Sequence, residues 1–289
     1  MSASPSVRLL IDYSSLLYRA FHSLPESLPA RGVHGFLNML GRLVADHRPR
    51  ELAICVDDDW RPAFRTDALP SYKAHRVAEE GEEDPVAADE ALGRDVLDAL
   101  GFAVVGAEGF EAEDVIATLA ARATGPVAIV SGDRDCFALV RDPGVVVLYP
   151  VKGVTTLARV DEAEITRRYG IPGRAYLDFA LLRGDPSDGL PGVRGIGEKT
   201  AAALVARYGS LDAILAATDV AAPVARRLAE GREYLAAARR VVPPVATVPL
   251  PPRSLALPRA AAHPRRLATL VREHDLGGPV ERLHAALAR

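Results

Sequence analysis

The feature that most constrains this 289-residue chain is the alternation of short apolar runs with helical patterns in its first half. Five runs rich in Val and Ile are typical of buried strands, and they cover residues 7–11, 51–56, 102–105, 126–130 and 145–149. Helical spacing of apolar residues lies between most of them, over residues 14–24, 34–47, 88–101 and 111–123. This order predicts an α/β fold with a mainly parallel sheet, helices on both faces, and ligands at the carboxyl ends of the strands.

The second half of the chain has a different pattern, because the strand signal stops near residue 160. Helical patterns follow over residues 161–170, 174–182, 198–209, 211–218 and 223–240. The Pro-rich residues 241–258 predict an extended crossing segment, and the last thirty residues return to helix. There is no internal repeat, and we expect one larger α/β domain and one smaller helical domain.

The bulk composition is that of an ordinary soluble globular protein, since 49% of the residues are apolar and 25% are charged. No apolar run reaches the length of a membrane span, and the first residues lack the pattern of a signal peptide. We therefore expect a cytoplasmic protein with no membrane partner. The two cysteines, Cys55 and Cys136, fall in predicted buried segments without metal-ligand spacing, which argues against a disulfide or a zinc site.

The net charge of −3 conceals an asymmetry along the chain. From Ala221 to the end there are 12 Arg and 5 acidic residues, a net charge of +7, which leaves −10 for residues 1–220. A basic carboxy-terminal region beside an acidic body is consistent with a polyanion-binding face next to a cation-binding site. Solvated helix faces would give the same count, so charge alone leaves both interpretations open.

Acidic residues gather where the predicted strands end, which is the ligand-binding edge of an α/β sheet. They are Asp12 after the first strand, Asp57 after the second, Glu111, Glu113 and Asp114 after the third, and Asp133 and Asp135 after the fourth. Each group alone would be explained as helix caps or loop starts. Together they would repel one another unless cations neutralised them, and oxygen-only ligands favour Mg²⁺ or Mn²⁺. Two such ions about 4 Å apart support phosphodiester hydrolysis.

Residues 182–209 place two more aspartates, Asp185 and Asp188, just before a glycine-studded turn and a helix. Gly195 and Gly197 free the backbone at this turn, so that N–H groups at the helix start can bind a phosphate oxygen. Lys199 and Thr200 add a charge and a hydroxyl. The alternative is a tight helix–helix turn with a glycine hinge. With the other carboxylates, the stretch predicts metal chemistry and phosphate anchoring in one segment.

With these residues in view, the chain resembles the 5′-nuclease family, which includes flap endonucleases and the 5′→3′ exonuclease domain of bacterial DNA polymerase I. The resemblance spans nearly the whole chain, through LLIDYSSLLYRAFH, GFLNML, FRTDALPSYKAHR, EAEDVIATLA, IVSGDRD and GDPSDGLPGVRGIGEKTA in the family's order. It implies a PIN-like nuclease core over residues 1–180 with a helical arch near 64–92. Residues 181–289 would form a helix-three-turn-helix DNA-binding motif and a C-terminal helical region.

The resemblance also implies an activity and its partners. We expect a metal-dependent flap endonuclease and 5′→3′ exonuclease of DNA replication and repair, which acts as a monomer on a 5′ flap, nick or 5′ end at a duplex junction. Two or three Mg²⁺ or Mn²⁺ ions would serve as cofactors, with K⁺ at the helix-three-turn-helix motif. The implied metal ligands are Asp12, Asp57, Glu111, Glu113, Asp114, Asp133, Asp135, Asp185 and Asp188.

Basic and aromatic residues at the start of the implied arch complete the expected site. Lys73 and Arg76 are the implied catalytic cations, which would stabilise charge on the scissile phosphate, and Tyr72 would stack on an unpaired base. The implied DNA-binding residues are Arg19, Arg65, Tyr72, Gly195, Gly197, Lys199 and Thr200. A surface helix with Tyr72 half-buried is the alternative for the arch residues.

Three positions depart from the family pattern: Tyr13 where it usually has Gly, Glu113 where it usually has Asp, and Gly189 where it often has Asn. Glu113 keeps the charge but reaches farther, so we expect it to change the metal spacing or the preferred ion. The acidic run at residues 79–84 is interpreted as a solvated loop, with repulsion of continuous duplex as the alternative.

Two other functions remain as hypotheses, namely a PIN-type ribonuclease and a non-catalytic protein that binds DNA junctions. PIN ribonucleases are usually shorter and lack the arch and the glycine-rich duplex anchor. A junction binder would gain nothing from carboxylates that repel phosphate.

Overall fold

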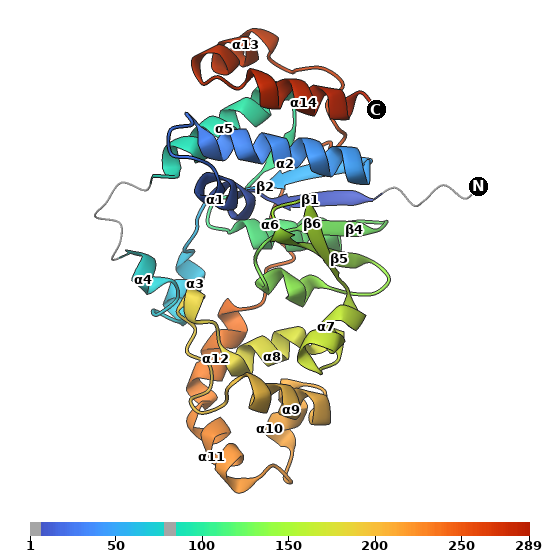
Figure 1. Cartoon of the computed structure of the whole chain (residues 1–289). Coiled ribbons are helices and arrows are strands. Elements are labelled where there is room, and N and C mark those ends of the chain that lie inside the picture. Colours follow the sequence, from blue (N-terminus) through green and yellow to red (C-terminus); the bar gives the residue numbers. More distant parts are fainter. Residues whose placement is uncertain (1–6, 78–84) are drawn as a thin grey trace, which may run out of the picture.

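The structure is a computed structural model that describes residues 7–77 and 85–289, and a six-stranded sheet lies at its centre (Figure 1). The strand order is β3-β2-β1-β4-β5-β6. The strands are β1 (Arg8–Asp12), β2 (Glu51–Cys55), β3 (Ala103–Val105), β4 (Val127–Val130), β5 (Val145–Lys152) and β6 (Thr156–Val160). The first five are parallel, and β6 pairs antiparallel with β5. The prediction of an α/β fold with a mainly parallel sheet is therefore confirmed.

β6 is the strand that the sequence did not reveal. Its central residues, Leu157, Ala158 and Arg159, are partly or fully exposed, and only Val160 is completely buried. A half-exposed edge strand lacks the continuous apolar run that marked the buried parallel strands.

Alternate residues of each strand enter two separate cores, one on each face of the sheet. Leu9 and Ile11 of β1 pack on one face, against α1 (Tyr13–Ser23), α2 (Arg31–His47) and α5 (Ala87–Leu100). Leu10 packs on the opposite face, against α6 (Ala112–Ala121). Because strand side chains alternate between faces, a run that is apolar throughout fills both cores at once.

The helical half of the chain lies below the sheet in the view of Figure 1. Its helices are α7 (Glu162–Tyr169), α8 (Tyr176–Arg183), α9 (Glu198–Tyr208), α10 (Leu211–Ala216), α11 (Ala222–Glu230) and α12 (Arg232–Val241). Short 3-10 turns at Asp135–Leu139, Gly173–Ala175 and Pro186–Asp188 join the larger elements.

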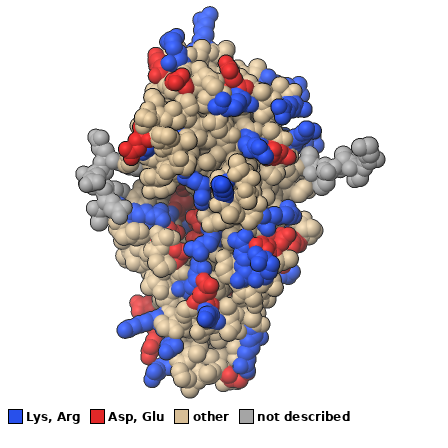
Figure 2. Space-filling model, in the orientation of Figure 1, with Lys and Arg blue, Asp and Glu red and all other residues tan. Residues whose placement is uncertain are grey.

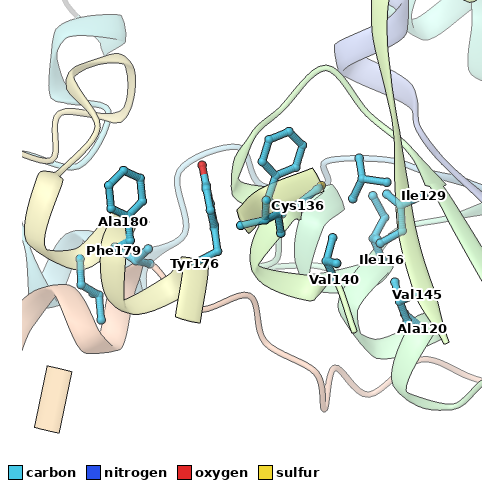
Figure 3. Close-up of a cluster of buried hydrophobic side chains, with 14 of the residues drawn as sticks. Ile116, Ala120, Ile129, Cys136, Val140, Val145, Tyr176, Phe179 and Ala180 are labelled. Carbon is cyan, nitrogen blue, oxygen red and sulfur yellow. The ribbon is translucent and has the colours of Figure 1, made fainter. Parts of the chain in front are cut away.

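One apolar core runs from the sheet into this helical half. Figure 3 shows Tyr176 and Phe179 of α8 beside Cys136, which belongs to the 3-10 turn at Asp135–Leu139. Ile129 of β4 lies on the other side of Cys136 in the same apolar cluster. The ring of Tyr176 lies 5.4 Å from that of Phe137 and 5.8 Å from that of Phe179. This continuous packing fixes the helical half relative to the strand ends.

Val241, the first residue of the predicted crossing segment, still belongs to α12, and residues 242–258 cross back along α6 with a turn at 246–247. The backbone N–H of Val245 donates to Asp114 Oδ1 at 2.7 Å, and Thr118 Oγ1 donates to the Val245 carbonyl at 3.0 Å. The chain then forms α13 (Pro264–Glu273) and α14 (Gly277–Leu287), which pack on α5 and α2 at the other end of the molecule from α11 (Figure 1). The division of the chain at residues 180 and 181 stays a prediction.

Two short helices, α3 (Ala63–Ala68) and α4 (Ala74–Val77), form the first part of the implied arch. The acidic run at 79–84 lies outside the described residues, so its interpretation stays a prediction. Among the helices of residues 7–77 and 85–289, none is both long and apolar enough to cross a membrane.

Candidate active site

The carboxyl ends of three neighbouring strands, β2, β1 and β4, bring sequence-distant acids together. Figure 2 shows a hollow in the middle of the molecule with acidic atoms inside it and Lys and Arg atoms around it. Asp57, just after β2, accepts from Ser14 Oγ at 2.6 Å and from the Ala112 N–H at 2.8 Å. These two donors fix the carboxylate between α1 and α6.

Asp12 ends β1 and is buried beneath the same hollow. Its carboxylate accepts from Ser131 Oγ at 2.5 Å and from the Ser15 N–H at 3.2 Å, which caps α1. Burial raises the pKa of Asp12 to about 7, and repulsion from Asp57 and Asp133 adds to the effect. The strand edge therefore holds carboxylates close enough to disfavour one another's charge.

Asp133 and Asp135 follow β4 and face the two aspartates of the helical half, Asp185 and Asp188. Withdrawal from water holds the pKa of Asp135 well above its usual range, and the charges of Asp133, Asp188 and Asp185 raise it further. Asp185 accepts from the Ser187 N–H at 2.9 Å and thereby caps the Pro186–Asp188 turn. The continuous core described above places this turn opposite the strand ends.

The acids at the start of α6 have a different environment, because a buried arginine neutralises them. Arg65 is completely inaccessible to solvent, and its Nη2 donates to Glu113 and to Asp114 at 2.7 Å each. Its Nη1 donates to Asp114 at 3.0 Å and also contacts Glu111. Burial alone would lower the pKa of Arg65, but the charges of Glu113 and Glu111 raise it. The guanidinium is thus the counter-ion of three expected metal ligands.

Tyr72 and Lys73 also face Glu111. The Tyr72 hydroxyl donates to Glu111 Oε2 at 2.7 Å, and Lys73 Nζ contacts the other oxygen of the same carboxylate. Lys73 Nζ also donates to the Trp60 carbonyl at 3.3 Å. The expected catalytic lysine therefore lies inside the carboxylate cluster.

The expected roles of Arg65 and Tyr72 as DNA contacts do not describe this arrangement. Arg65 is 0% exposed and Tyr72 is 3% exposed, so neither presents a surface to phosphate or to a base. The alternative of a half-buried Tyr72 on a surface helix is wrong, because the residue is buried. The DNA-contact roles of Arg65 and Tyr72 stay predictions. The cluster of Glu111, Glu113 and Asp114 draws these side chains inward, because buried carboxylates require cations and hydrogen-bond donors.

Arg76 lies beside Asp188, at the edge of the carboxylate cluster. Its Nη2 donates to Asp188 Oδ1 at 2.8 Å and to the Ser187 carbonyl at 2.9 Å, while its side chain stays 41% exposed. Arg76 therefore remains accessible from solvent beside the carboxylates.

The donor set fits hard divalent cations in kind. The facing ligands are carboxylate oxygens, and burial, with repulsion between them as a further cause, raises the pKa values of Asp12 and Asp135. Within the part of the chain that the structure describes, no three His, Cys, Asp or Glu side chains are arranged to hold an ion as they stand.

Comparisons with known proteins agree with this geometry. The model of the 5′-3′ exonuclease N-terminal resolvase-like domain matches residues 7–170, and that of the 5′-3′ exonuclease C-terminal SAM fold matches residues 171–263. The chain belongs to the 5′-3′ exonuclease family. It is accordingly a nuclease, that is, a phosphodiester hydrolase.

Relatives of this 5′-3′ exonuclease family member include both stand-alone and fused proteins. A 5′-3′ exonuclease of Streptomyces coelicolor is 50% identical, over 96% of this chain and 99% of its own length. DNA polymerase I of Mycobacterium tuberculosis is 44% identical, over 75% of this chain but only 24% of its own length. The flap endonuclease of bacteriophage T5, in a complex with DNA and metal ions, has the same fold with a TM-score of 0.67 and 18% identity, over 98% of this chain and 99% of the phage chain.

The glycine turn that the sequence predicts to bind phosphate lies ahead of α9. Gly195 has φ +79, a backbone conformation that favours glycine, and Gly197 is the N-cap of α9. Lys199 is exposed on the first turn of that helix. Arg227 of α11 donates to the Gly195 carbonyl at 2.8 Å and was not among the expected site residues. No local pattern distinguishes it from the other arginines of this basic region.

Arg19 lies one turn after Ser15 on α1 and reaches the loop that follows β4. A Cβ at Gly132 would lie 3.0 Å from Arg19 Nη2, and Arg19 Nε is buried with no hydrogen-bond partner among the described residues. The N–H of Gly132 donates to Ser15 Oγ at 2.9 Å. Arg19 thus borders the carboxylate cluster with an unused donor.

Ser14 and Ser131, which orient Asp57 and Asp12, were missed by the sequence reasoning. Both lie within two residues of an expected ligand just after a strand, Ser14 in the first turn of α1 and Ser131 in the loop after β4, so their position was the available signal.

The fold accommodates two of the departures from the family pattern, Tyr13 and Glu113, through contacts with neighbouring residues. The ring of Tyr13 is buried edge-on against Phe36, and its hydroxyl donates to the Glu90 carbonyl at 3.0 Å. Gly93 makes room for it, since a Cβ there would lie 2.0 Å from the Tyr13 hydroxyl. Glu113 uses its longer side chain to reach Arg65.

Proposed function

We propose that this nuclease hydrolyses DNA phosphodiesters at 5′ flaps and 5′ ends of duplex junctions, with divalent metal ions as cofactors. The observation that carries the proposal is that one segment, residues 185–200, joins two carboxylates of the central cluster to the glycine turn and helix N-terminus at the start of α9. The bacteriophage T5 relative, whose complex contains DNA and metal ions, supports the same assignment.

The carboxylates at the strand ends are the proposed metal ligands, with Mg²⁺ or Mn²⁺ as the ions. Those that face the hollow are Asp12, Asp57, Asp133, Asp135, Asp185 and Asp188. When bound, such ions polarise phosphate oxygens and lower the pKa of a water molecule. Glu111, Glu113 and Asp114 would act as further ligands from the start of α6. Their ion pairs with Arg65 and Lys73 would limit the movement of these carboxylates.

The chain's own cations would bind and orient the substrate. Arg76 is accessible beside Asp188, and Lys73 lies deeper, so a phosphate that enters the hollow would meet both. The unused Nε of Arg19 offers a further donor from α1. Because these donors come from packed elements, they would stabilise charge that develops on the phosphate without large rearrangement.

The duplex would be held away from the cut, at the turn before α9. Backbone N–H groups at a helix N-terminus bind phosphate, and Lys199 adds a positive charge to them. K⁺ at this turn is part of the same proposal and rests on the family resemblance. Action as a monomer in the cytoplasm is likewise proposed.

The experiment compares 5′-labelled and 3′-labelled flap, nicked, blunt and single-stranded DNA, each with Mg²⁺ or Mn²⁺. We expect cleavage near the 5′ end that is strongest on the flap. Preference for single-stranded RNA would favour the PIN-type ribonuclease instead, and tight junction binding without cleavage in either metal would favour a non-catalytic binder. The match of residues 171–263 to the family's second domain supports the duplex-dependent function.

A further inference from the structure

The loop that carries Asp188 is joined to the segment that carries Lys73 by backbone contacts. The N–H of Lys73 donates to the Asp188 carbonyl at 2.9 Å, and Ser71 Oγ donates to the Gly189 carbonyl at 3.0 Å. These residues are more than a hundred positions apart in the chain. The contacts therefore fix the start of the implied arch on the loop that leads to the duplex-binding turn.

Gly189 is the residue that permits this close approach. It has φ +68, and a Cβ added to it would lie 2.2 Å from the Ser71 carbonyl oxygen and 3.2 Å from the Lys73 nitrogen. Such a contact would have to open by about 1 Å, since real Cβ atoms essentially never come within 3.0 Å. Asn tolerates the left-handed backbone better than most residues, but its Cβ would meet the same carbonyl.

Lys73 depends on this loop because its own backbone is unusual. Its φ is +50, in a region that residues with a side chain seldom occupy. The hydrogen bond from its N–H to Asp188 helps to hold that conformation, which directs the amine toward Glu111 and the Trp60 carbonyl. A displaced loop would leave the lysine backbone without this support.

We propose that Gly189 is a positioning residue for Lys73, and that the absence of a side chain at position 189 sets where the lysine amine lies. The proposal rests on the proposed function for the catalytic role of Lys73. It predicts that a side chain at position 189 shifts the Ser71–Lys73 backbone by about 1 Å and impairs cleavage through the lysine.

The test compares Gly189→Asn with Gly170→Asn. Gly170 ends α7 with the same φ of +68, but a Cβ there would meet no atom within 4 Å. Both variants carry the same backbone strain, and only one carries the clash. In single-turnover cleavage of a 5′ flap we expect Gly189→Asn to lose between about tenfold and a hundredfold, as misplacement by about 1 Å can cause. Gly170→Asn should stay within about twofold.

Two further measurements separate positioning from general damage. Trp60 is the single tryptophan of the chain, and its carbonyl accepts from Lys73, so its fluorescence without metal or DNA reports on this segment. The emission should change in Gly189→Asn and not in Gly170→Asn. In a Lys73→Ala background, Gly189→Asn should lower the rate by less than about threefold, because coupled residues are not additive.

Equal rates and equal Trp60 emission for the two Asn variants would overturn the positioning role, as would full additivity with Lys73→Ala. Should Gly189→Asn fail to fold, Gly189→Ala adds the clashing Cβ alone and must give the same pattern. Retention of the wild-type rate by Lys73→Ala would overturn the catalytic role of Lys73. The Trp60 comparison would still test the position of the segment, so the two failures are distinguishable.

Discussion

Replacement of Arg65 is the sharpest test of how the carboxylate cluster is held together. The guanidinium is fully buried and donates to Glu113, Asp114 and Glu111, and its Nε donates to the Val241 carbonyl at 2.9 Å. Arg65→Met keeps an unbranched apolar side chain but removes every donor. Asp114 would then lose its ion-pair partner, and Glu111 would keep only Lys73.

The expected magnitude follows from that burial. Removal of one partner of a buried ion pair typically costs about 3–5 kcal/mol, because the remaining charge has lost its compensation. At roughly 2 °C per kcal/mol for a protein of this size, the melting temperature should fall by about 6–10 °C. Urea unfolding followed by circular dichroism measures the loss directly.

The control is Arg167→Met, which removes the exposed pair between Arg167 and Glu164 on α7. Because water screens that pair, we expect no resolved change in the unfolding midpoint. If Arg65→Met lowers the free energy of unfolding by less than about 1 kcal/mol, the carboxylates do not depend on this cation and the reasoning is refuted.

The remaining predictions concern cleavage and DNA binding. EDTA should abolish cleavage and added Mg²⁺ or Mn²⁺ should restore it; full activity after rigorous chelation would contradict a metal mechanism. Asp135→Asn should lower the cleavage rate by orders of magnitude while duplex binding, measured by fluorescence anisotropy, persists. Lys73→Ala should lose about a hundredfold in the single-turnover rate with little change in affinity, and a loss below about threefold would remove it from the catalytic residues. Lys199→Ala with Gly197→Val should weaken binding to all duplex substrates and reduce the salt dependence of binding, whereas an unchanged salt dependence would argue against a phosphate contact there.

The parallel strands and the helices on the sheet could be predicted because their signals are local. A buried strand must be apolar on both faces, so runs such as residues 51–56 and 145–149 are visible without any partner. The topology rule for parallel sheets then placed Asp12, Asp57 and Asp133 on one edge. β6 escaped prediction because a half-exposed edge strand carries little of that signal.

The residues of the implied arch show the limit of this reasoning. Arg65 and Tyr72 carry the chemistry of a DNA-binding segment, and their spacing gives no indication that both are buried. The side chains of Arg65 and Tyr72 point inward because they bind Glu111 and Asp114. These two acids lie more than thirty residues later in the chain but next to Arg65 and Tyr72 in space.

What the sequence by itself determined was the α/β class, the set of carboxylates at the strand ends and the glycine turn before α9, since each depends on neighbouring residues or on strand order. Only the tertiary structure decided which cation neutralises which acid, that Lys73 contacts Glu111, and that a Cβ at Gly189 would meet the Ser71 carbonyl. The physical reason is that ion pairing and steric exclusion act between atoms a few ångströms apart, and separation along the chain carries no information about that distance.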